Sequence, residues 1–349
     1  MTGARLDALV VGYGHVAEHA YLPALARCPA CRVVGVVEPD PDRRARAAAA
    51  GLAGYATVED AAAAAAAGRT VAIDLTPAPL HGEVNARLLA AGFHCLSEKP
   101  GAGTAAEWRR LTCQARDAGL ALVAAPQLHR GWSMATVLGL LASGRLGSAT
   151  AAHIDASKVG PAVDGRLEAH RDWFYGRSVG AAMDIGPYAL TTAVALFGRP
   201  SGWTWRRMAA EAVRDQAGLR DGATAIAAAA LHETFVLTME WSEGPVATAH
   251  VAFGRHRLGM PSCTVYCTGG RIELDLWAPD GPVRVVETPG YWEEHECELV
   301  PEAPPRNLYD MNLDFCLRCV DDPRLLPAHW EQVAAVLEIL DGRDGGEHA

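Results

Sequence analysis

The chain has 349 residues, of which 50% are hydrophobic and 21% are charged, and its formal net charge is −10. This length predicts two domains, and the apolar content is sufficient for a large core, which disfavours a disordered chain. An acidic chain also lacks the basic face that nucleic acid or an anionic membrane requires, so we expect neither as its main partner.

No apolar run in the sequence is long enough to cross a bilayer, and residues 1–7 lack the charged and apolar regions of a signal peptide. We therefore expect a cytoplasmic protein. Its nine cysteines are scattered, which favours reduced thiols. Cys28-x-x-Cys31 and Cys316-x-x-Cys319 have the spacing of zinc ligands, but they fall at a helix–strand junction and inside a helical segment. We expect no structural metal and no required disulfide.

Residues 1–125 alternate between short apolar segments and helical segments. Strands are predicted at 6–11, 32–37, 71–75, 93–96 and 120–124. Helices are predicted at 18–27, 40–50, 57–67, 80–91 and 104–118, with Thr57 and Thr104 as caps. Strands that alternate with helices form a parallel sheet with crossover helices, so the first domain is predicted to be a doubly wound α/β domain.

The pattern changes after Pro126. Strands then follow one another at 150–157, 226–231, 235–241, 246–253, 264–268, 271–276 and 283–286. Helices are predicted at 134–143, 181–197, 308–320 and 329–340. Successive strands with flanking helices indicate a mostly antiparallel sheet, so residues 126–349 are predicted to form an α+β domain.

A glycine-rich loop, Gly12-Tyr13-Gly14-His15-Val16-Ala17, joins the first predicted strand to the first helix. In a dinucleotide-binding (Rossmann) domain, the first glycine makes the tight turn and the second lets the backbone approach the pyrophosphate. The small third residue lets the helix pack on the strand, and the helix N-terminus favours the phosphate charge. A methyltransferase is the rival interpretation of such a loop, but it does not predict the motifs that follow.

Glu38 ends the second predicted strand, where an acidic residue accepts hydrogen bonds from the ribose hydroxyls. A carboxylate there repels a 2′-phosphate, so the sequence favours NAD as the cofactor. Arg43 and Arg44 follow closely and are able to reach a phosphate, which leaves NADP open.

Of the 31 lysine and arginine residues, only Lys99 and Lys158 are lysine. An ammonium group is compact and shifts its pKa readily, whereas a guanidinium stays charged, so we expect a specific role for Lys99. It lies in Glu98-Lys99-Pro100, directly after the strand predicted at 93–96. The segment Thr76-Pro77-Ala78-Pro79-Leu80-His81 follows the strand at 71–75, at the same carboxyl edge of the sheet, where ligands bind.

Asp184 and Tyr188 are four residues apart in the helix predicted at 181–197, so they share one face. A Lys, an Asp and a Tyr that converge on a nicotinamide would form an acid/base group for alcohol–ketone chemistry. Each has a simpler interpretation, since Asp184 would also serve as a helix cap and Tyr188 as a half-buried core residue. Their combination with Lys99 and the glycine loop favours catalysis.

The order of these motifs, over nearly the whole chain, resembles that of the Gfo/Idh/MocA oxidoreductases. The resemblance rests on the glycine loop, the Thr-Pro-x-x-x-His segment, the Glu-Lys-Pro motif and the helix start at 180–188. It implies a Rossmann domain and an α/β domain with a large open sheet, which often mediates homodimers or homotetramers. Members mostly oxidise or reduce sugars, inositols and related polyols with NAD(P).

By this resemblance, Lys99 matches the catalytic lysine and Asp184 the substrate-orienting aspartate. Tyr188 stands where many members have a catalytic histidine, which is similar to the branch of glucose–fructose oxidoreductase, xylose dehydrogenase and dihydrodiol dehydrogenase. The residues predicted to bind the cofactor are Gly12, Tyr13, Gly14, His15, Val16, Glu38, Arg43, Thr76, Pro77, His81, Glu98 and Lys99.

Two segments depart from the family pattern. Gly-Ala-Ala at 180–182 replaces a run of glycines, and Pro-Gln-Leu-His-Arg at 126–130 stands where members often have Tyr-Asn-x-Arg. Both lie near the expected substrate site, so the sequence indicates the chemistry better than the substrate. The candidate substrate contacts, for which a solvated loop is the alternative, are Lys158, Arg171, Trp173 and Tyr175.

The sequence therefore predicts an NAD(P)-dependent dehydrogenase or reductase that acts on a secondary alcohol or ketone of a sugar, sugar derivative or polyol. The alternative enzyme is a reductase of a dihydrodiol-like or biosynthetic ketone or imine intermediate. The alternative outside enzymes is a non-catalytic NAD-sensing protein, which is disfavoured because Lys99 and Tyr188 are both present.

Overall fold

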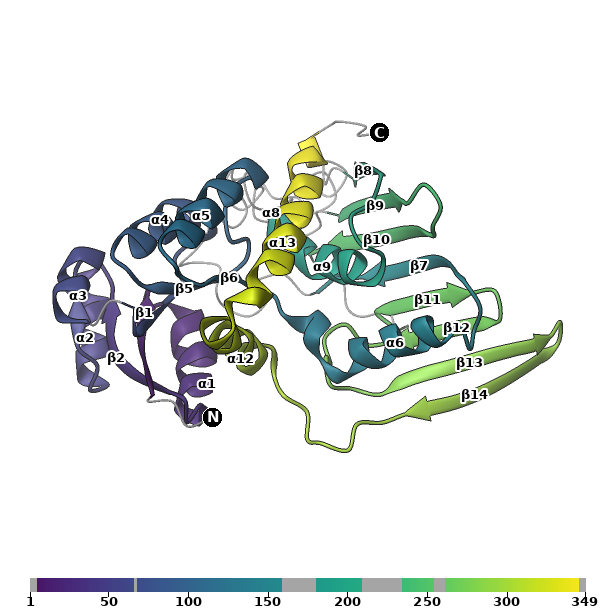
Figure 1. The fold of residues 1–349 in the computed structure, drawn as a ribbon, viewed down its shortest axis with the longest axis horizontal. Helices are drawn as coiled ribbons and strands as arrows, with labels where there is room; N and C mark the ends of the chain where they lie inside the picture. The colour runs from purple at the N-terminus through teal and green to yellow at the C-terminus, as the bar shows by residue number, and fades with distance from the viewer. Residues whose placement is uncertain (1–4, 66–67, 159–179, 209–233, 254–260, 345–349) are drawn as a thin grey trace, which may run out of the picture. The chain divides into compact units, whose positions relative to one another are not determined.

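The structure of the chain is a computed structural model that describes residues 5–65, 68–158, 180–208, 234–253 and 261–344 (Figure 1). The chain divides into two compact units. The first unit consists of residues 1–127 and 308–337, and the second of residues 128–307 and 338–349. The strand predicted at 226–231 lies outside the described residues, as do Arg171, Trp173 and Tyr175.

The first unit is built on a six-stranded sheet with the order β3-β2-β1-β4-β5-β6. Every neighbouring pair is parallel, as predicted, and the order is that of a Rossmann domain. The residues of its central strands are apolar and largely buried, as is typical of parallel sheets that are covered on both faces. The strands are β1 (Leu6–Val11), β2 (Cys31–Val37), β3 (Gly54–Tyr55), β4 (Thr70–Asp74), β5 (His94–Ser97) and β6 (Leu122–Ala124).

Three of the described crossover helices of this sheet, α2, α3 and α5, begin at side chains that cap them. Asp40, Thr57 and Thr104 each accept a hydrogen bond from a backbone N–H two or three residues further on, which confirms the predicted caps Thr57 and Thr104. The helical elements are η1 (Ala17–Tyr21), α1 (Leu22–Arg27), α2 (Pro41–Ala49), α3 (Val58–Ala64), η2 (Ala78–Leu80), α4 (His81–Ala90) and α5 (Ala105–Asp117).

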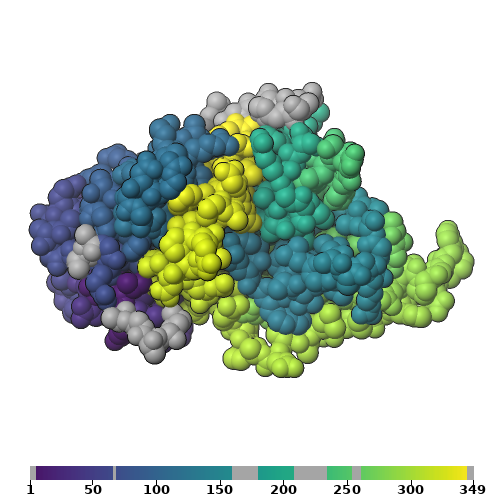
Figure 2. Space-filling model, in the orientation of Figure 1, coloured from purple at the N-terminus to yellow at the C-terminus, as the bar shows by residue number. Residues whose placement is uncertain are grey.

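Two helices from the C-terminal part of the chain pack with this Rossmann sheet. The helix α12 (Leu308–Asp321) packs against α1, β5 and β6, and the short η4 (Pro323–Leu325) leads into α13 (Leu326–Asp341). The indole N–H of Trp108 donates to Trp330 O at 3.0 Å, and that of Trp330 donates to Leu122 O at 2.8 Å. Figure 2 shows these helices in yellow against the blue helices of the first unit.

All nine cysteines are free thiols. Cys31, Cys316 and Cys319 lie together in the apolar core of the first unit, with Cys28 packed against it. Burial raises the pKa of Cys31 to about 12 and the pKa of Cys316 well above its usual value, so both thiols are inert at neutral pH. Within the described residues, no three His, Cys, Asp or Glu side chains form a group that would hold a metal ion.

The second unit contains an eight-stranded sheet with the order β14-β13-β12-β11-β7-β10-β9-β8. All neighbouring pairs are antiparallel except β7 and β10, which confirms the predicted mostly antiparallel sheet. The strands are β7 (Ala149–Asp155), β8 (Gly202–Met208), β9 (Thr234–Glu240), β10 (Val246–Ala252), β11 (Cys263–Cys267), β12 (Gly270–Leu274), β13 (Val283–Gly290) and β14 (Glu293–Leu299).

The helical elements of the second unit differ from the prediction in one place. The helix expected at 181–197 is two helices, α8 (Gly180–Asp184) and α9 (Gly186–Phe197), separated at Ile185. Pro187 lies in the first turn of α9 and has no N–H to donate to the preceding turn, so the helix cannot continue through it. The remaining elements are η3 (Leu128–Arg130), α6 (Trp132–Ser143) and η5 (Gly342–Asp344).

Among the helices that the structure describes, none combines the length and the apolar character needed to cross a membrane.

Candidate active site

The glycine-rich loop has the backbone that a dinucleotide requires. Gly12 has φ +88°, and a Cβ at this position would lie 3.0 Å from the carbonyl oxygen of Leu75. Only glycine fits such a turn without strain. A Cβ on Gly14 would meet nothing within 4 Å, so open space lies beside the backbone where a pyrophosphate would approach. Ala17 is fully buried, as close packing of η1 on the sheet requires.

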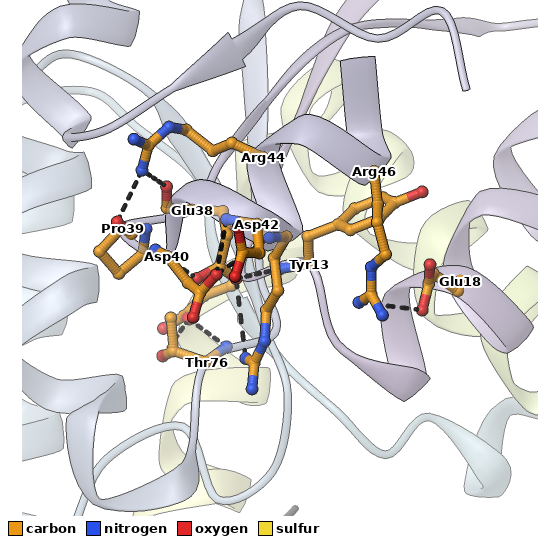
Figure 3. A network of polar contacts seen from close by, with 11 residues as sticks. Tyr13, Glu18, Glu38, Pro39, Asp40, Asp42, Arg44, Arg46 and Thr76 are labelled. Atoms are coloured by element: carbon orange, nitrogen blue, oxygen red, sulfur yellow. Dashed lines mark hydrogen bonds and ion pairs between the residues drawn. The ribbon is translucent and has the colours of Figure 1, made fainter. Parts of the chain in front are cut away.

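Glu38 is fastened to the glycine loop at the end of β2 (Figure 3). Its Oε2 accepts a hydrogen bond from Tyr13 N at 2.8 Å, and its Oε1 accepts one from Asp40 N at 3.0 Å. The side chain is 4% exposed. The carboxylate is therefore fixed beside the loop, where the predicted ribose contact requires it.

The two arginines beside Glu38 have different surroundings. Arg44 Nη1 donates to the carbonyl oxygens of Glu38 at 2.7 Å and Pro39 at 2.6 Å, so its guanidinium is turned toward the backbone. Arg43 Nη1 lies 3.9 Å from Glu38 Oε2, and its side chain is 41% exposed. Of the two arginines, only Arg43 therefore has its guanidinium beside the Glu38 carboxylate.

A second polar group surrounds the loops that follow β4 and β5. The ring of His81 lies between two carbonyl oxygens, with Nε2 2.8 Å from Thr76 O and Nδ1 2.6 Å from Pro100 O. The imidazole therefore joins the Thr76-Pro77 loop to the Glu98-Lys99-Pro100 loop. Asn85 supports the same place, since its Nδ2 donates to Ser97 Oγ and to Gly101 O.

Asp74 is a buried acid that our sequence analysis missed, although an aspartate in the apolar run 71–75 was a visible signal. Its Oδ1 accepts hydrogen bonds from the backbone N–H of Thr76 at 3.0 Å and from the Thr76 hydroxyl at 2.6 Å. Its Oδ2 is buried and has no hydrogen-bond partner among the described residues. Burial raises the pKa of this carboxyl group.

Glu98 and Lys99 follow β5 at the same edge of the sheet. Glu98 N donates to Asp74 O at 2.9 Å, and the Lys99–Pro100 peptide bond is cis. Glu98 Oε1 accepts a hydrogen bond from the Tyr21 hydroxyl at 2.8 Å, and its Oε2 accepts one from Lys99 N at 3.1 Å. The structure thus brings together the glycine loop, Glu38, Thr76, His81, Glu98 and Lys99 at the carboxyl ends of neighbouring strands.

Asp184 and Tyr188 lie on either side of the break between α8 and α9, and both are buried. The N-cap of α9 is Ile185, whose side chain forms no capping hydrogen bond, so Asp184 does not occupy the N-cap position itself. Asp184 Oδ2 lies 3.4 Å from Lys158 Nζ. The ring of Tyr188 packs on that of Trp277, with 4.9 Å between the centroids.

These two neighbours, Lys158 and Trp277, are held in the second unit by backbone hydrogen bonds of their own. Lys158 continues the line of β7, and its backbone N–H donates to Ala252 O at 3.1 Å. Trp277 follows β12 and donates from its backbone to Asp275 Oδ1 at 3.0 Å. Trp277 was missed because nothing near it in the sequence connects it with Tyr188, 89 residues earlier.

His129 is a further residue that the sequence analysis did not single out. Both of its ring nitrogens are buried, and neither has a hydrogen-bond partner among the residues that the structure describes. It lines a small cavity together with Ser133, Thr192 and Asp275. Burial, assisted by the charge of Arg130, lowers the pKa of His129 to about 3, so the ring is neutral at physiological pH.

Comparisons with known proteins agree with this architecture. The family model GFO_IDH_MocA, described as an oxidoreductase family with an NAD-binding Rossmann fold, matches residues 6–125. The model of the GFO/IDH/MocA C-terminal domain matches residues 134–273. No curated protein sequence matches the chain significantly.

Several solved structures have the same fold. An aldose–aldose oxidoreductase from Caulobacter crescentus, complexed with glycerol, has a TM-score of 0.75 at 19% identity, with 97% of each chain covered. The 3-ketoreductase KijD10 from Actinomadura kijaniata, in complex with TDP-benzene and NADP, has a TM-score of 0.74 at 18% identity, with 98% of each chain covered. GenD2 from gentamicin A biosynthesis, in complex with NAD, has a TM-score of 0.72 at 21% identity over 98% of this chain and 93% of its own.

The two family models together span most of the chain, and the strand order of the first unit is that of the Rossmann fold which the first model names. The chain therefore belongs to the GFO/IDH/MocA family of oxidoreductases, and its first unit is an NAD-binding Rossmann domain.

Proposed function

We propose that this oxidoreductase interconverts a secondary alcohol and a ketone on a sugar, a sugar derivative or a polyol. The nicotinamide, when bound, supplies or accepts the hydride. The observation that carries the proposal is the placement of a buried, ion-paired Asp184 and a buried Tyr188 on either side of the break between α8 and α9. A carboxylate and a phenol there offer one group to orient a hydroxyl and one to move its proton.

Tyr188 is proposed as the acid/base. In the oxidation direction, the substrate O–H gives its proton to the Tyr188 oxygen while the C–H bond gives its hydride, and a C=O bond forms. Reduction reverses both transfers. A phenol has an ordinary pKa of about 10, so a nearby cation is needed to favour the phenolate at neutral pH. We propose that Lys99 supplies this charge.

Asp184 is proposed to hold the substrate. The ammonium group of Lys158, 3.4 Å away, favours the charged carboxylate in a buried place. An ionised carboxylate only accepts hydrogen bonds, so it selects hydroxyl groups over carbonyl oxygens as neighbours. Trp277, half-buried beside Tyr188, adds an apolar wall of the kind that packs against the C–H face of a sugar ring.

We propose NAD as the preferred cofactor. Glu38 is held by two backbone N–H groups, so it cannot turn away from a 2′-phosphate without losing both hydrogen bonds. Arg44 is occupied by backbone carbonyls, which leaves Arg43 as the only nearby arginine with an exposed guanidinium beside the carboxylate among the described residues. The solved relatives include complexes with both cofactors, so the preference is a property of this chain's own residues.

The proposal is tested by following NADH absorbance with a panel of aldoses, inositols, acyclic polyols and keto-sugars, each with NAD and with NADP. We expect turnover of at least one sugar or polyol, and loss of that turnover in Tyr188→Phe. Tight NAD binding with no turnover on any alcohol, ketone or imine of the panel would instead indicate an NAD-sensing protein. Light scattering on the same sample tests the homodimer or homotetramer that we expect of this protein.

A further inference from the structure

Four buried or half-buried groups of the first unit form a continuous chain of hydrogen bonds. Gln127 N donates to Asn312 Oδ1 at 3.0 Å, and Asn312 Nδ2 donates to the Tyr21 hydroxyl at 3.0 Å. The Tyr21 hydroxyl donates to Glu98 Oε1 at 2.8 Å. These hydrogen bonds link the segment after β6, the helix α12, the element η1 and the segment after β5.

The direction of this chain is determined by its ends. The backbone N–H of Gln127 can only donate, so the Asn312 atom that faces it must be the amide oxygen Oδ1. The amide nitrogen Nδ2 of Asn312 therefore faces Tyr21. The Tyr21 oxygen then accepts from Asn312 and uses its single hydrogen for Glu98. Every donor therefore points toward the Glu98 carboxylate, and hydrogen bonds aligned in this way strengthen one another.

The Glu98 carboxylate, held by Tyr21, also binds the backbone of Lys99. Its second oxygen, Oε2, accepts the backbone N–H of Lys99 at 3.1 Å, so the carboxylate is held from both sides. Asn312 and Tyr21 are fully buried, and burial together with the charge of Glu98 raises the pKa of Tyr21 well above its usual range. Tyr21 is therefore a permanent donor, since its hydroxyl keeps its proton at any working pH.

We propose that Tyr21 and Asn312 are positioning residues, which act through Glu98 to set the position of the Lys99 ammonium group. Only the catalytic role of Lys99 in this inference rests on the proposed function. Neither residue touches the glycine loop or Glu38 in any contact described above. Their removal would therefore disturb Lys99, while the glycine loop and Glu38 keep their own hydrogen bonds and NAD affinity should fall little. A misplacement of about 1 Å is enough to cost about 10²-fold in turnover.

The two lysines of the chain make a test that needs no substrate. Reductive ¹³C-methylation labels only Lys99, Lys158 and the N-terminal amine, and Lys99→Arg and Lys158→Arg assign the signals. We expect Tyr21→Phe and Asn312→Leu each to shift or broaden the Lys99 methyl resonance while the Lys158 resonance keeps its position. The double variant should resemble either single variant, because Asn312 acts through the Tyr21 hydroxyl.

The control is Trp330→Phe, which removes a different hydrogen bond of the same C-terminal helices, to Leu122 O, without touching Glu98. It should lower the melting temperature and leave the Lys99 resonance in place. The inference is overturned if the Lys99 resonance is unmoved in Tyr21→Phe and Asn312→Leu, or if it moves equally in Trp330→Phe. Where a substrate is found, kcat of Tyr21→Phe should fall at least tenfold with NAD affinity within twofold of wild type.

Discussion

Lys158 Nζ lies 3.4 Å from Asp184 Oδ2, so one of the chain's two lysines is the counter-ion of a buried carboxylate. The Asp184 side chain is 6% exposed and that of Lys158 is 34% exposed. A carboxylate in such a place stays charged at low cost only because a cation is beside it. The counter-ion is therefore a compact ammonium group, in a chain whose cations are nearly all arginine.

Replacement of Lys158 by methionine is expected to destabilise the protein. Loss of one partner of a fully buried ion pair costs about 3–5 kcal/mol, and the partial exposure of Lys158 reduces this to roughly 1–2 kcal/mol. Urea unfolding of Lys158→Met measures the loss. The double variant Lys158→Met/Asp184→Asn should recover part of it, because no unpaired charge then remains.

The matched control is Arg199→Met, which removes a cation from the ion pair with Glu338 on a more exposed part of the same unit. That loss should stay below about 1 kcal/mol. Equal losses for Lys158→Met and Arg199→Met would show that Lys158 is an ordinary surface residue.

Replacement of Glu38 by serine is expected to narrow the preference for NAD over NADP. The change removes the negative charge that opposes a 2′-phosphate and leaves Arg43 free to meet it. We expect the ratio of the two dissociation constants, measured by fluorescence titration, to fall by about tenfold, which corresponds to about 1.4 kcal/mol. The control is Glu83→Ser, which removes an exposed acid on α4 and should leave the ratio of the NAD and NADP dissociation constants unchanged. Wild-type protein that binds NADP tenfold more tightly than NAD would refute the assignment and direct attention to Arg43.

Because His129 is buried and neutral, we expect the free energy of unfolding to decrease in acid. Its pKa is about 3 in the folded chain and about 6.5 when exposed, so the unfolded chain takes up the proton first as the pH falls. The free energy of unfolding should therefore decrease from about pH 6.5 downward, by up to ~1.4 kcal/mol per pH unit from this one group. His129→Leu should flatten that slope and, by removing two unpartnered nitrogens, raise stability at pH 7 by roughly 1 kcal/mol. His295→Leu, on the exposed β14, is the control, and an identical acid slope in wild type and His129→Leu would contradict the assignment.

Most of the Rossmann unit was predictable because its signals are local. Apolar runs of five or six residues, capping threonines and a glycine loop each occupy a short stretch, and the parallel order of the sheet confirms them. The placement of Glu38 and Thr76 at one edge of the sheet was predictable for the same reason, since strand ends of a parallel sheet meet there.

Other features depend on contacts between distant residues or on the absence of burial. Asn312 donates a hydrogen bond to Tyr21, which is 291 positions away in the sequence, and no local pattern in either segment predicts this contact. The strand β14 was not predicted because its sequence is dominated by glutamate and most of its side chains are exposed, so it lacks the alternation that marks a half-buried strand. The break between α8 and α9, in contrast, had a visible cause in Pro187.

The pH dependence of kcat in Lys99→Met tests the central claim most directly. If Lys99 lowers the pKa of Tyr188, its replacement should reduce kcat at neutral pH by at least ~10²-fold and move the alkaline-rising limb of oxidation toward the pKa of a free phenol. NAD affinity should change little, and Lys99→Met/Tyr188→Phe should be scarcely worse than either single variant, because the two residues act as a unit. Near-normal turnover of Lys99→Met with an unmoved limb would contradict the mechanism.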